Sequence, residues 1–142
     1  MSEENCIFCK IIRGEIPSSV IFEDEQSIAF MDAFPVAEGH CLLIPRKHYV
    51  NMFDVDPDVV AHLAKNLVDL TKRVQKATGS EGVLNIVANG EGAGQDVFHL
   101  HFHAIPRNKD SPFGFKFPPG YRETIADRED LDQMAEKIRE ST

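Results

Sequence analysis

Three histidines alternate with apolar residues in the segment 97–105, Val-Phe-His-Leu-His-Phe-His-Ala-Ile. Such an alternation, with a period of two, is typical of a β-strand with one buried face. Because successive side chains of a strand point to opposite faces, His99, His101 and His103 are expected to line one surface. Imidazole changes its charge near neutral pH and serves as an acid, a base, a nucleophile or a metal ligand. The segment is therefore predicted to carry a functional site rather than an inert polar face.

The length and the charge of the chain limit what it can be. Its 142 residues fit one domain, residues 1–142, which is long enough to bury a core. No apolar run is long enough to span a membrane, and the acidic start, residues 1–5, does not resemble a secretion signal, so a cytoplasmic location is expected. The net charge of −8 argues against a nucleic-acid polymer as partner, although a single nucleotide is compatible with it.

Short apolar runs between turn residues predict further strands at 20–22, 27–31, 40–44 and 83–88. Helices are predicted at 6–14, 56–78 and 127–139. The long helix has Asp56 as its cap, Pro57 in its first turn and Gly79 as its stop. In the last helix, the residues expected to face inward are Leu131, Met134, Ala135 and Ile138. Short paired strands with one long helix indicate an α+β domain with an antiparallel sheet.

The loop 89–96 leads directly into the histidine segment and contains Gly90, Gly92 and Gly94. Glycine allows backbone conformations that aim several N–H groups at one point, which is an arrangement that binds phosphate oxygens. An exposed flexible turn is the alternative. Beside three histidines, a phosphate ester is the expected ligand.

The run from His99 to Ile105 resembles the histidine-triad motif of the nucleotide hydrolases and transferases called HIT proteins. The resemblance extends over most of the chain, and the further matching blocks are 6–17, 29–32, 39–48, Asn89 and 94–95. It implies a HIT-like fold with a five-stranded antiparallel sheet, one long helix and a C-terminal helix. It also implies that the sheet continues into a second subunit of a homodimer.

The resemblance assigns catalytic roles. His101 matches the nucleophile that attacks the α-phosphorus of a nucleotide and forms a nucleotidyl-histidine intermediate. His103 is expected to contact the phosphate and to help protonate the leaving group, and His99 completes the triad. His40 matches a supporting histidine, with a plain buried histidine as the alternative. The residues expected to hold the phosphate are Asn89, Gly94, Gln95, Asp96 and Val97.

Asp96 is a departure from the family pattern, because many phosphoramidase relatives have serine at this position. A carboxylate beside a phosphate is unfavourable unless it points away, caps the loop or acts on the leaving group. The segment 113–121 also differs from the eukaryotic phosphoramidases.

The resemblance also implies a nucleoside pocket. Asp32 matches an acid that accepts hydrogen bonds from both ribose hydroxyls, a role that suits an ionised carboxylate. A turn residue before Pro35 is the alternative for Asp32. The apolar wall for the base is expected to comprise Ile7, Phe8, Ile11, Ile16 and Phe30, with ordinary core packing as their alternative.

Cys6 and Cys9 form a Cys-x-x-Cys pair very near the start of the chain. A redox pair normally follows a strand, and only five residues precede Cys6. Tetrahedral zinc needs two more ligands, for which His48 and His99 match a zinc-bearing subset of bacterial-type HIT proteins. A structural Zn²⁺ site is therefore predicted, with two reduced cysteines as the alternative.

Together these features predict a homodimeric hydrolase that cleaves a purine nucleoside 5′-phosphoramidate or a related nucleotide conjugate at the α-phosphate. Two alternatives remain. One is a dinucleoside polyphosphate hydrolase, which needs positive charge for its extra phosphates. The other is a nucleotide-sensing protein without turnover, although binding alone does not require His101.

Overall fold

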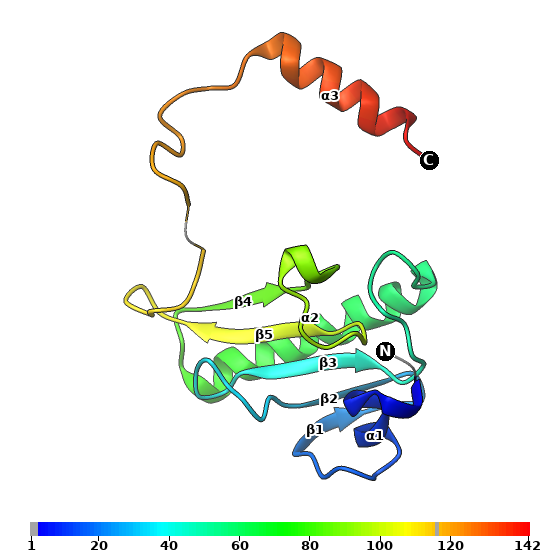
Figure 1. Ribbon diagram of the computed structural model, residues 1–142. Coiled ribbons are helices and arrows are strands. Elements are labelled where there is room, and N and C mark those ends of the chain that lie inside the picture. Colours follow the sequence, from blue (N-terminus) through cyan, green and yellow to red (C-terminus); the bar gives the residue numbers. More distant parts are fainter. Residues whose placement is uncertain (1–2, 116) are drawn as a thin grey trace.

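Five short strands form one antiparallel sheet in the order β1-β2-β3-β5-β4 in the computed structural model (Figure 1). The structure describes residues 3–115 and 117–142, so Met1, Ser2 and Lys116 of the predicted single domain lie outside the described residues. The strands are β1 (Val20–Glu23), β2 (Ser27–Met31), β3 (Cys41–Pro45), β4 (Gly82–Ile86) and β5 (Phe102–Arg107). The helices are α1 (Ile7–Ile12), α2 (Pro57–Thr78) and α3 (Arg128–Glu140), with short 3₁₀ turns at Glu3–Asn5 and Glu91–Ala93. The predicted α+β class and antiparallel sheet are confirmed.

Helices cover both faces of the centre of the sheet. Leu43 of β3 packs in one cluster with α2, whereas its neighbours Leu42 and Ile44 pack in a second cluster with Phe8 of α1. This is why β2 and β3 read as continuous apolar runs instead of alternating ones. The short α1 is thereby fixed against the sheet, close to the segment that carries the histidines.

The long helix α2 begins and ends as its sequence predicts. Asp56 caps it by accepting a hydrogen bond from the Asp58 N–H, and Gly79 ends it in the left-handed region at a φ of 65°. Its apolar stripe, which includes Leu63 and Leu70, is buried against the sheet. Within the described residues, no helix combines the length and the apolar composition that a membrane crossing requires.

The histidine segment is only partly a strand, so the predicted strand 97–105 was too long at its start. β5 begins at Phe102, and the Leu100 N–H donates to the Tyr49 carbonyl, outside the sheet. Alternation of the side chains nevertheless persists. Leu100 is buried in the α2 cluster, whereas His99 and His101 both contact the Phe8 ring on the opposite side.

The C-terminal helix α3 stands away from the sheet (Figure 1). Its predicted inward residues are exposed: Leu131 by 41%, Met134 by 53% and Ile138 by 67%, and Ala135 is exposed as well. The prediction that they face inward was wrong for a single chain, because the segment before α3 carries the helix past the domain. An apolar stripe on a helix predicts burial but does not say which surface covers it.

Asp24 ties the turn between β1 and β2 to α2. One carboxylate oxygen accepts from the N–H groups of Gln26 and Ser27, and the other is 2.8 Å from both His62 Nε2 and Asn66 Nδ2. Although burial alone raises the pKa of Asp24, the hydrogen bonds from Asn66, Gln26, His62 and Ser27 together hold it below the usual 3.8.

Replacement of Asp24 by alanine is expected to lower the free energy of unfolding by about 1–2 kcal/mol at pH 7, a modest value because the side chain is partly exposed. A carboxyl group with a depressed pKa stabilises the fold above its unfolded pKa, and this contribution is lost as the pH falls below about 4. Urea denaturation of both proteins at pH 7 and pH 3 tests this. Asp69→Ala, which removes an exposed ion pair with Arg73, is the control and should cost less. If Asp24→Ala lowered the free energy of unfolding equally at both pH values, the stabilising role of the Asp24 carboxylate would be contradicted.

Candidate functional site

His101 presents one unoccupied ring nitrogen at the centre of the candidate site. Its Nδ1 lies 2.7 Å from the His99 carbonyl oxygen, which can only accept, so Nδ1 carries the proton. With the proton on Nδ1, Nε2 is the ring nitrogen that can present a lone pair. The side chain is almost fully buried, yet it lines a pocket, so this lone pair is directed at whatever the pocket holds. A nucleophilic histidine requires this tautomer.

A chain of hydrogen bonds sets the tautomers of two neighbouring histidines. The Val36 N–H donates to His40 Nδ1 at 3.2 Å, so the proton of His40 lies on Nε2. His40 Nε2 donates to His103 Nδ1 at 2.9 Å, which leaves the proton of His103 on Nε2. His103 therefore offers an N–H group beside His101, whose ring centroid is 4.9 Å away.

Burial keeps these supporting rings neutral. It lowers the pKa of His103 to about 4, with further lowering by His101 and His40, while Asp32 and Asp96 oppose the shift. Burial also lowers the pKa of His40. Both rings are consequently uncharged at pH 7, as the tautomer assignment requires.

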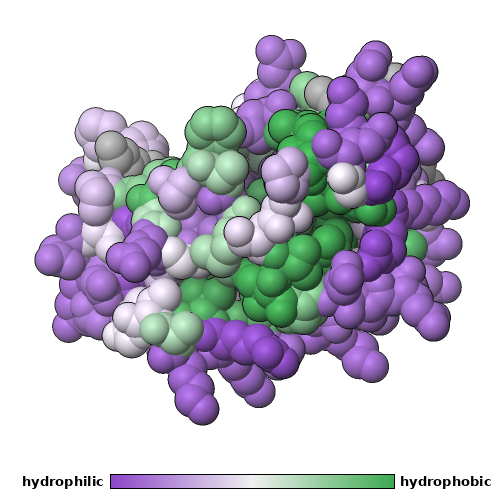
Figure 2. Space-filling model, turned by 90° about the horizontal axis from the view of Figure 1, so that it is seen from below, coloured by the Kyte–Doolittle hydropathy of each residue, from purple (hydrophilic) through white to green (hydrophobic). Residues whose placement is uncertain are grey.

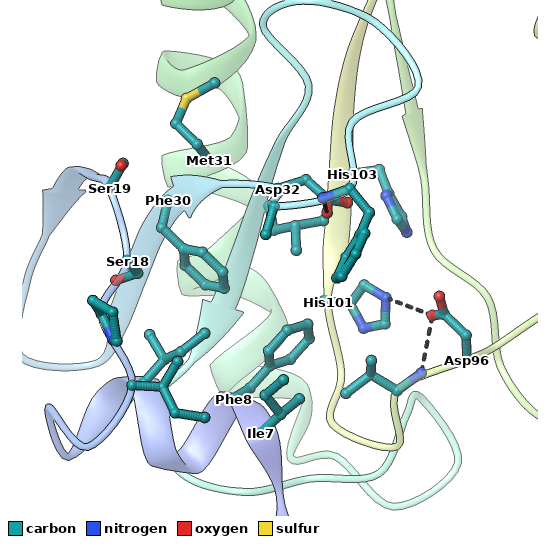
Figure 3. Close-up of a pocket in the computed structure, with 17 residues that line it drawn as sticks. Ile7, Phe8, Ser18, Ser19, Phe30, Met31, Asp32, Asp96, His101 and His103 are labelled. Carbon is teal, nitrogen blue, oxygen red and sulfur yellow. Dashed lines mark hydrogen bonds and ion pairs between the residues drawn. The ribbon is translucent and has the colours of Figure 1, made fainter.

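His101 and His103 border a pocket of about 420 Å³ (Figure 3). Most of the predicted site residues line it: Ile7, Phe8, Ile11, Ile16, Phe30, Asp32, Asp96, Val97, His101 and His103. Figure 3 shows an apolar side with Phe8 and Phe30 and a polar side with Asp96, His101 and His103. In the space-filling view from below, a patch of apolar residues is bordered by polar ones (Figure 2). A base and a phosphate can therefore occupy different ends of one pocket.

Sequence reasoning missed several lining residues, namely Pro17, Ser18, Ser19, Met31, Ala33, Phe34 and Leu42. The two serines follow directly after Ile16 and Pro17 in the chain. Polar residues next to a predicted wall residue were a signal that could have marked them.

Asp32 lies in a turn and also lines the pocket. Its Oδ1 accepts from the Phe34 N–H at 2.8 Å, as in a turn, and its Oδ2 lies 3.4 Å from His40 Nε2. The side chain is 17% exposed and faces the pocket. A carboxylate in this position retains acceptor capacity for hydroxyl groups of a ligand.

The glycine-containing loop contributes less directly than predicted. Gln95 is 4% exposed and uses its amide within the protein: it donates to the Val50 and Val97 carbonyls and accepts from Asn51 and Gly90. Asn89 accepts from the Met52 N–H. Asn89, Gly94 and Gln95 are not among the residues that line the pocket. In this geometry the side chains of Asn89 and Gln95 brace the loop that presents Asp96 and Val97.

His99 belongs to a different cluster, behind the pocket. Its Nδ1 lies 3.4 Å from Cys6 Sγ, 3.6 Å from Cys9 Sγ and 3.2 Å from His48 Nδ1. Cys9 Sγ is 3.4 Å from His48 Nδ1, and all four atoms lie within 4.8 Å of one another. The structure thus brings together the four residues predicted to bind metal, and it separates His99 from the other two triad histidines.

The chemistry of this cluster fits a tetrahedral zinc ion. Bonds of roughly 2.0–2.3 Å to nitrogen and sulfur place the ligand atoms about 3.3–3.8 Å apart, close to the distances between these four residues. His99 Nε2 donates to the Pro45 carbonyl at 2.8 Å, so its Nδ1 lone pair faces the cluster. Burial and the neighbouring Cys6 thiol raise the pKa of the Cys9 thiol to about 12, which disfavours the thiolate. A bound cation would stabilise the thiolate and offset this effect.

Comparison with known proteins decides the family. A family model described as "HIT domain" matches residues 13–110. The chain belongs to the HIT family. Its likeness to solved members extends over nearly the whole structure: a HIT family protein from Bacillus anthracis is 35% identical, with 99% of each chain covered and a TM-score of 0.89. The predicted HIT-like fold is confirmed.

Two relatives have names that state an activity. Adenosine 5′-monophosphoramidase hnt1 of Schizosaccharomyces pombe is 38% identical over 80% of this chain and 84% of its own length. Adenylylsulfatase HINT3 of Arabidopsis thaliana is 40% identical over 75% of this chain, which spans only 54% of that longer protein. A further solved relative is described as a Zn-bound histidine triad family protein from Mycobacterium smegmatis. It is 29% identical, with 96% of this chain and 99% of its own covered and a TM-score of 0.75.

Proposed function

We propose that this protein hydrolyses a purine nucleoside 5′-phosphoramidate at the α-phosphorus through a nucleotidyl intermediate on His101. The observation that carries the proposal is the tautomer of His101. Its Nδ1–H is held by the His99 carbonyl, so Nε2 offers a lone pair to the pocket. The family and the name of the Schizosaccharomyces pombe relative support the same reaction.

In the first step, the Nε2 lone pair of His101 forms a bond to phosphorus while the bond to the leaving nitrogen breaks. The leaving nitrogen keeps the electron pair and takes up one proton, so the amine departs neutral. Water then adds to phosphorus, the bond to Nε2 breaks and one proton is released, so the reaction consumes one water overall. The His103 Nε2–H is placed to donate a hydrogen bond to the reacting phosphate or leaving atom.

The charges around the pocket favour a phosphoramidate over a dinucleoside polyphosphate. Two carboxylates, Asp32 and Asp96, are among its lining residues, and no lysine or arginine is among them in the described part of the chain. Additional phosphates would therefore enter without a cationic partner.

Turnover of adenosine 5′-phosphoramidate and of diadenosine polyphosphates by the wild-type protein tests the proposal. Preferential release of AMP from the phosphoramidate is expected. Preference for the diadenosine polyphosphates would instead favour a dinucleoside polyphosphate hydrolase. Binding of AMP without turnover of either compound would indicate a nucleotide sensor instead.

Asp32→Ala is expected to raise the KM for adenosine 5′-phosphoramidate by about 10–100-fold, because hydrogen bonds to a charged acceptor are lost. The matched ligand is the 2′,3′-dideoxy analogue, which lacks both hydroxyls and should lose much less affinity on the same substitution. Equal losses for the two compounds, measured by steady-state kinetics, would argue against a ribose role.

We further propose that the cluster of Cys6, Cys9, His48 and His99 binds one structural Zn²⁺. When bound, the ion would pin the start of the chain to the segment that carries His101, without a part in the reaction. The ligand geometry and the Zn-bound relative support this assignment.

A homodimer in the cytoplasm completes the proposal. The exposed apolar face of α3 supports a second copy of the chain as the surface that covers it.

A further inference from the structure

We propose that Asp96 selects substrates by the charge of the leaving group, favouring neutral or cationic amines and rejecting anionic groups such as sulfate. This inference rests on the proposed function, because it assigns a specificity-determining residue to the same reaction.

The position of Asp96 places a negative charge beside the reacting atoms. Its Oδ1 lies 3.7 Å from Nε2 of His101, the atom that attacks phosphorus (Figure 3). The carboxylate is 82% exposed and is among the residues that line the pocket, so its charge borders the space that a bound substrate and its leaving group would fill. Its hydrogen bond is to the adjacent Val97 N–H at 2.9 Å, and no lysine or arginine pairs with it among residues 3–115 and 117–142.

A fixed negative charge beside the reacting atoms changes the free energy of the transition state by an amount that depends on the charge of the leaving group. Every nucleotide substrate brings the same charge on its nonbridging phosphate oxygens, so this part of the repulsion cancels between substrates. The leaving groups differ. Sulfate gains negative charge as its bond to phosphorus breaks, whereas an amine takes up a proton and departs neutral. Asp96 therefore raises the barrier for sulfate and leaves that for amines unchanged or lower.

The alternative for Asp96 is a purely local role, in which its oxygen orders the loop through the Val97 N–H. Asp96→Asn separates the two roles, because the amide oxygen can still accept this hydrogen bond while the charge is removed. Glu91→Gln is the matched control. Glu91 is an exposed acid of the same loop, it is not among the pocket residues, and its replacement changes the net charge equally.

The experiment compares kcat/KM for three adenylyl compounds whose leaving groups differ in charge. These are adenylyl sulfate, adenosine 5′-phosphoramidate, and a phosphoramidate of a diamine whose free end is an ammonium group. Asp96→Asn should raise the value for adenylyl sulfate about tenfold relative to the phosphoramidate, which is roughly the effect of one charge about 6 Å away in a partly hydrated site. It should lower the value for the diamine compound. Both changes should shrink at high salt, because Asp96 is exposed.

The outcomes distinguish a failure of this inference from a failure of the proposed hydrolase function on which it rests. A uniform change for all three compounds, or an equal change in Glu91→Gln, overturns the role of Asp96 while the hydrolase assignment stands. Absence of turnover of all three compounds by the wild-type protein overturns the proposed function itself. Asp96→Ser, which also removes the charge, should reproduce the order found for Asp96→Asn.

Discussion

Replacement of His101 by alanine is expected to lower kcat/KM for adenosine 5′-phosphoramidate by about 10⁴-fold, while AMP still binds. The substitution removes the nucleophile and leaves a direct attack by water as the remaining route, which the site is not built to assist. The apolar wall and Asp32 are untouched, so affinity for AMP should change by only a few fold. Steady-state kinetics and equilibrium binding of AMP measure the two quantities separately.

The control for this substitution is His62→Gln. His62 is bound to the Asp24 turn and lies outside the pocket, so its replacement should leave turnover close to that of the wild type. A His101→Ala protein that retains most of its activity would overturn the assigned nucleophile. A similar loss in His62→Gln would show that the assay reports folding and not chemistry.

Replacement of Cys6 by serine is expected to remove the bound zinc and to lower the melting temperature by about 10 °C or more. Cys6 is fully buried beside Cys9, His48 and His99, and a structural ion held by these ligands contributes its binding free energy to folding. For a chain of this length, a shift of that size corresponds to about 3 kcal/mol. Metal analysis of untagged protein should find about one zinc per chain in the wild type.

Cys41→Ser is the control for the metal site. Cys41 is equally buried but lies in β3, and its thiol points away from the cluster toward the Gly39 and Ala104 carbonyls. This variant should lose some stability and keep its zinc. A wild-type protein without zinc, or a Cys6→Ser protein that retains it, would contradict the proposed site.

Local sequence signals predicted the parts of the fold that depend on local physics. Asp56 and Gly79 end the long helix through their own backbone and side-chain chemistry, so its limits could be predicted closely. The start of β5 could not, because it depends on a partner far along the chain: Tyr49 takes the hydrogen bond of Leu100 that a longer strand would have used. The exposure of α3 could not be predicted either, because an apolar stripe indicates burial but does not identify the surface that would provide it.

In the candidate site, too, some features could be predicted from local sequence and others depend on residues far apart in the chain. The spacing of the histidines predicted that they cluster, and His101 and His103 do border one pocket. The different position of His99 depends on Cys6 and Cys9, which lie about ninety positions earlier in the chain, as the separations of 93 and 90 residues show. The family resemblance predicts that Gln95 holds the phosphate. Its burial, which only the folded structure reveals, commits its amide to the Val50 and Val97 carbonyls.

The stereochemical course at phosphorus tests the covalent intermediate most directly. A phosphoramidothioate analogue of one configuration would be hydrolysed in ¹⁸O-labelled water, and the configuration of the thiophosphate product determined. Two successive displacements, first by His101 and then by water, each invert phosphorus, so the account predicts overall retention. Inversion would mean that water attacks phosphorus directly and that His101 is not a nucleophile.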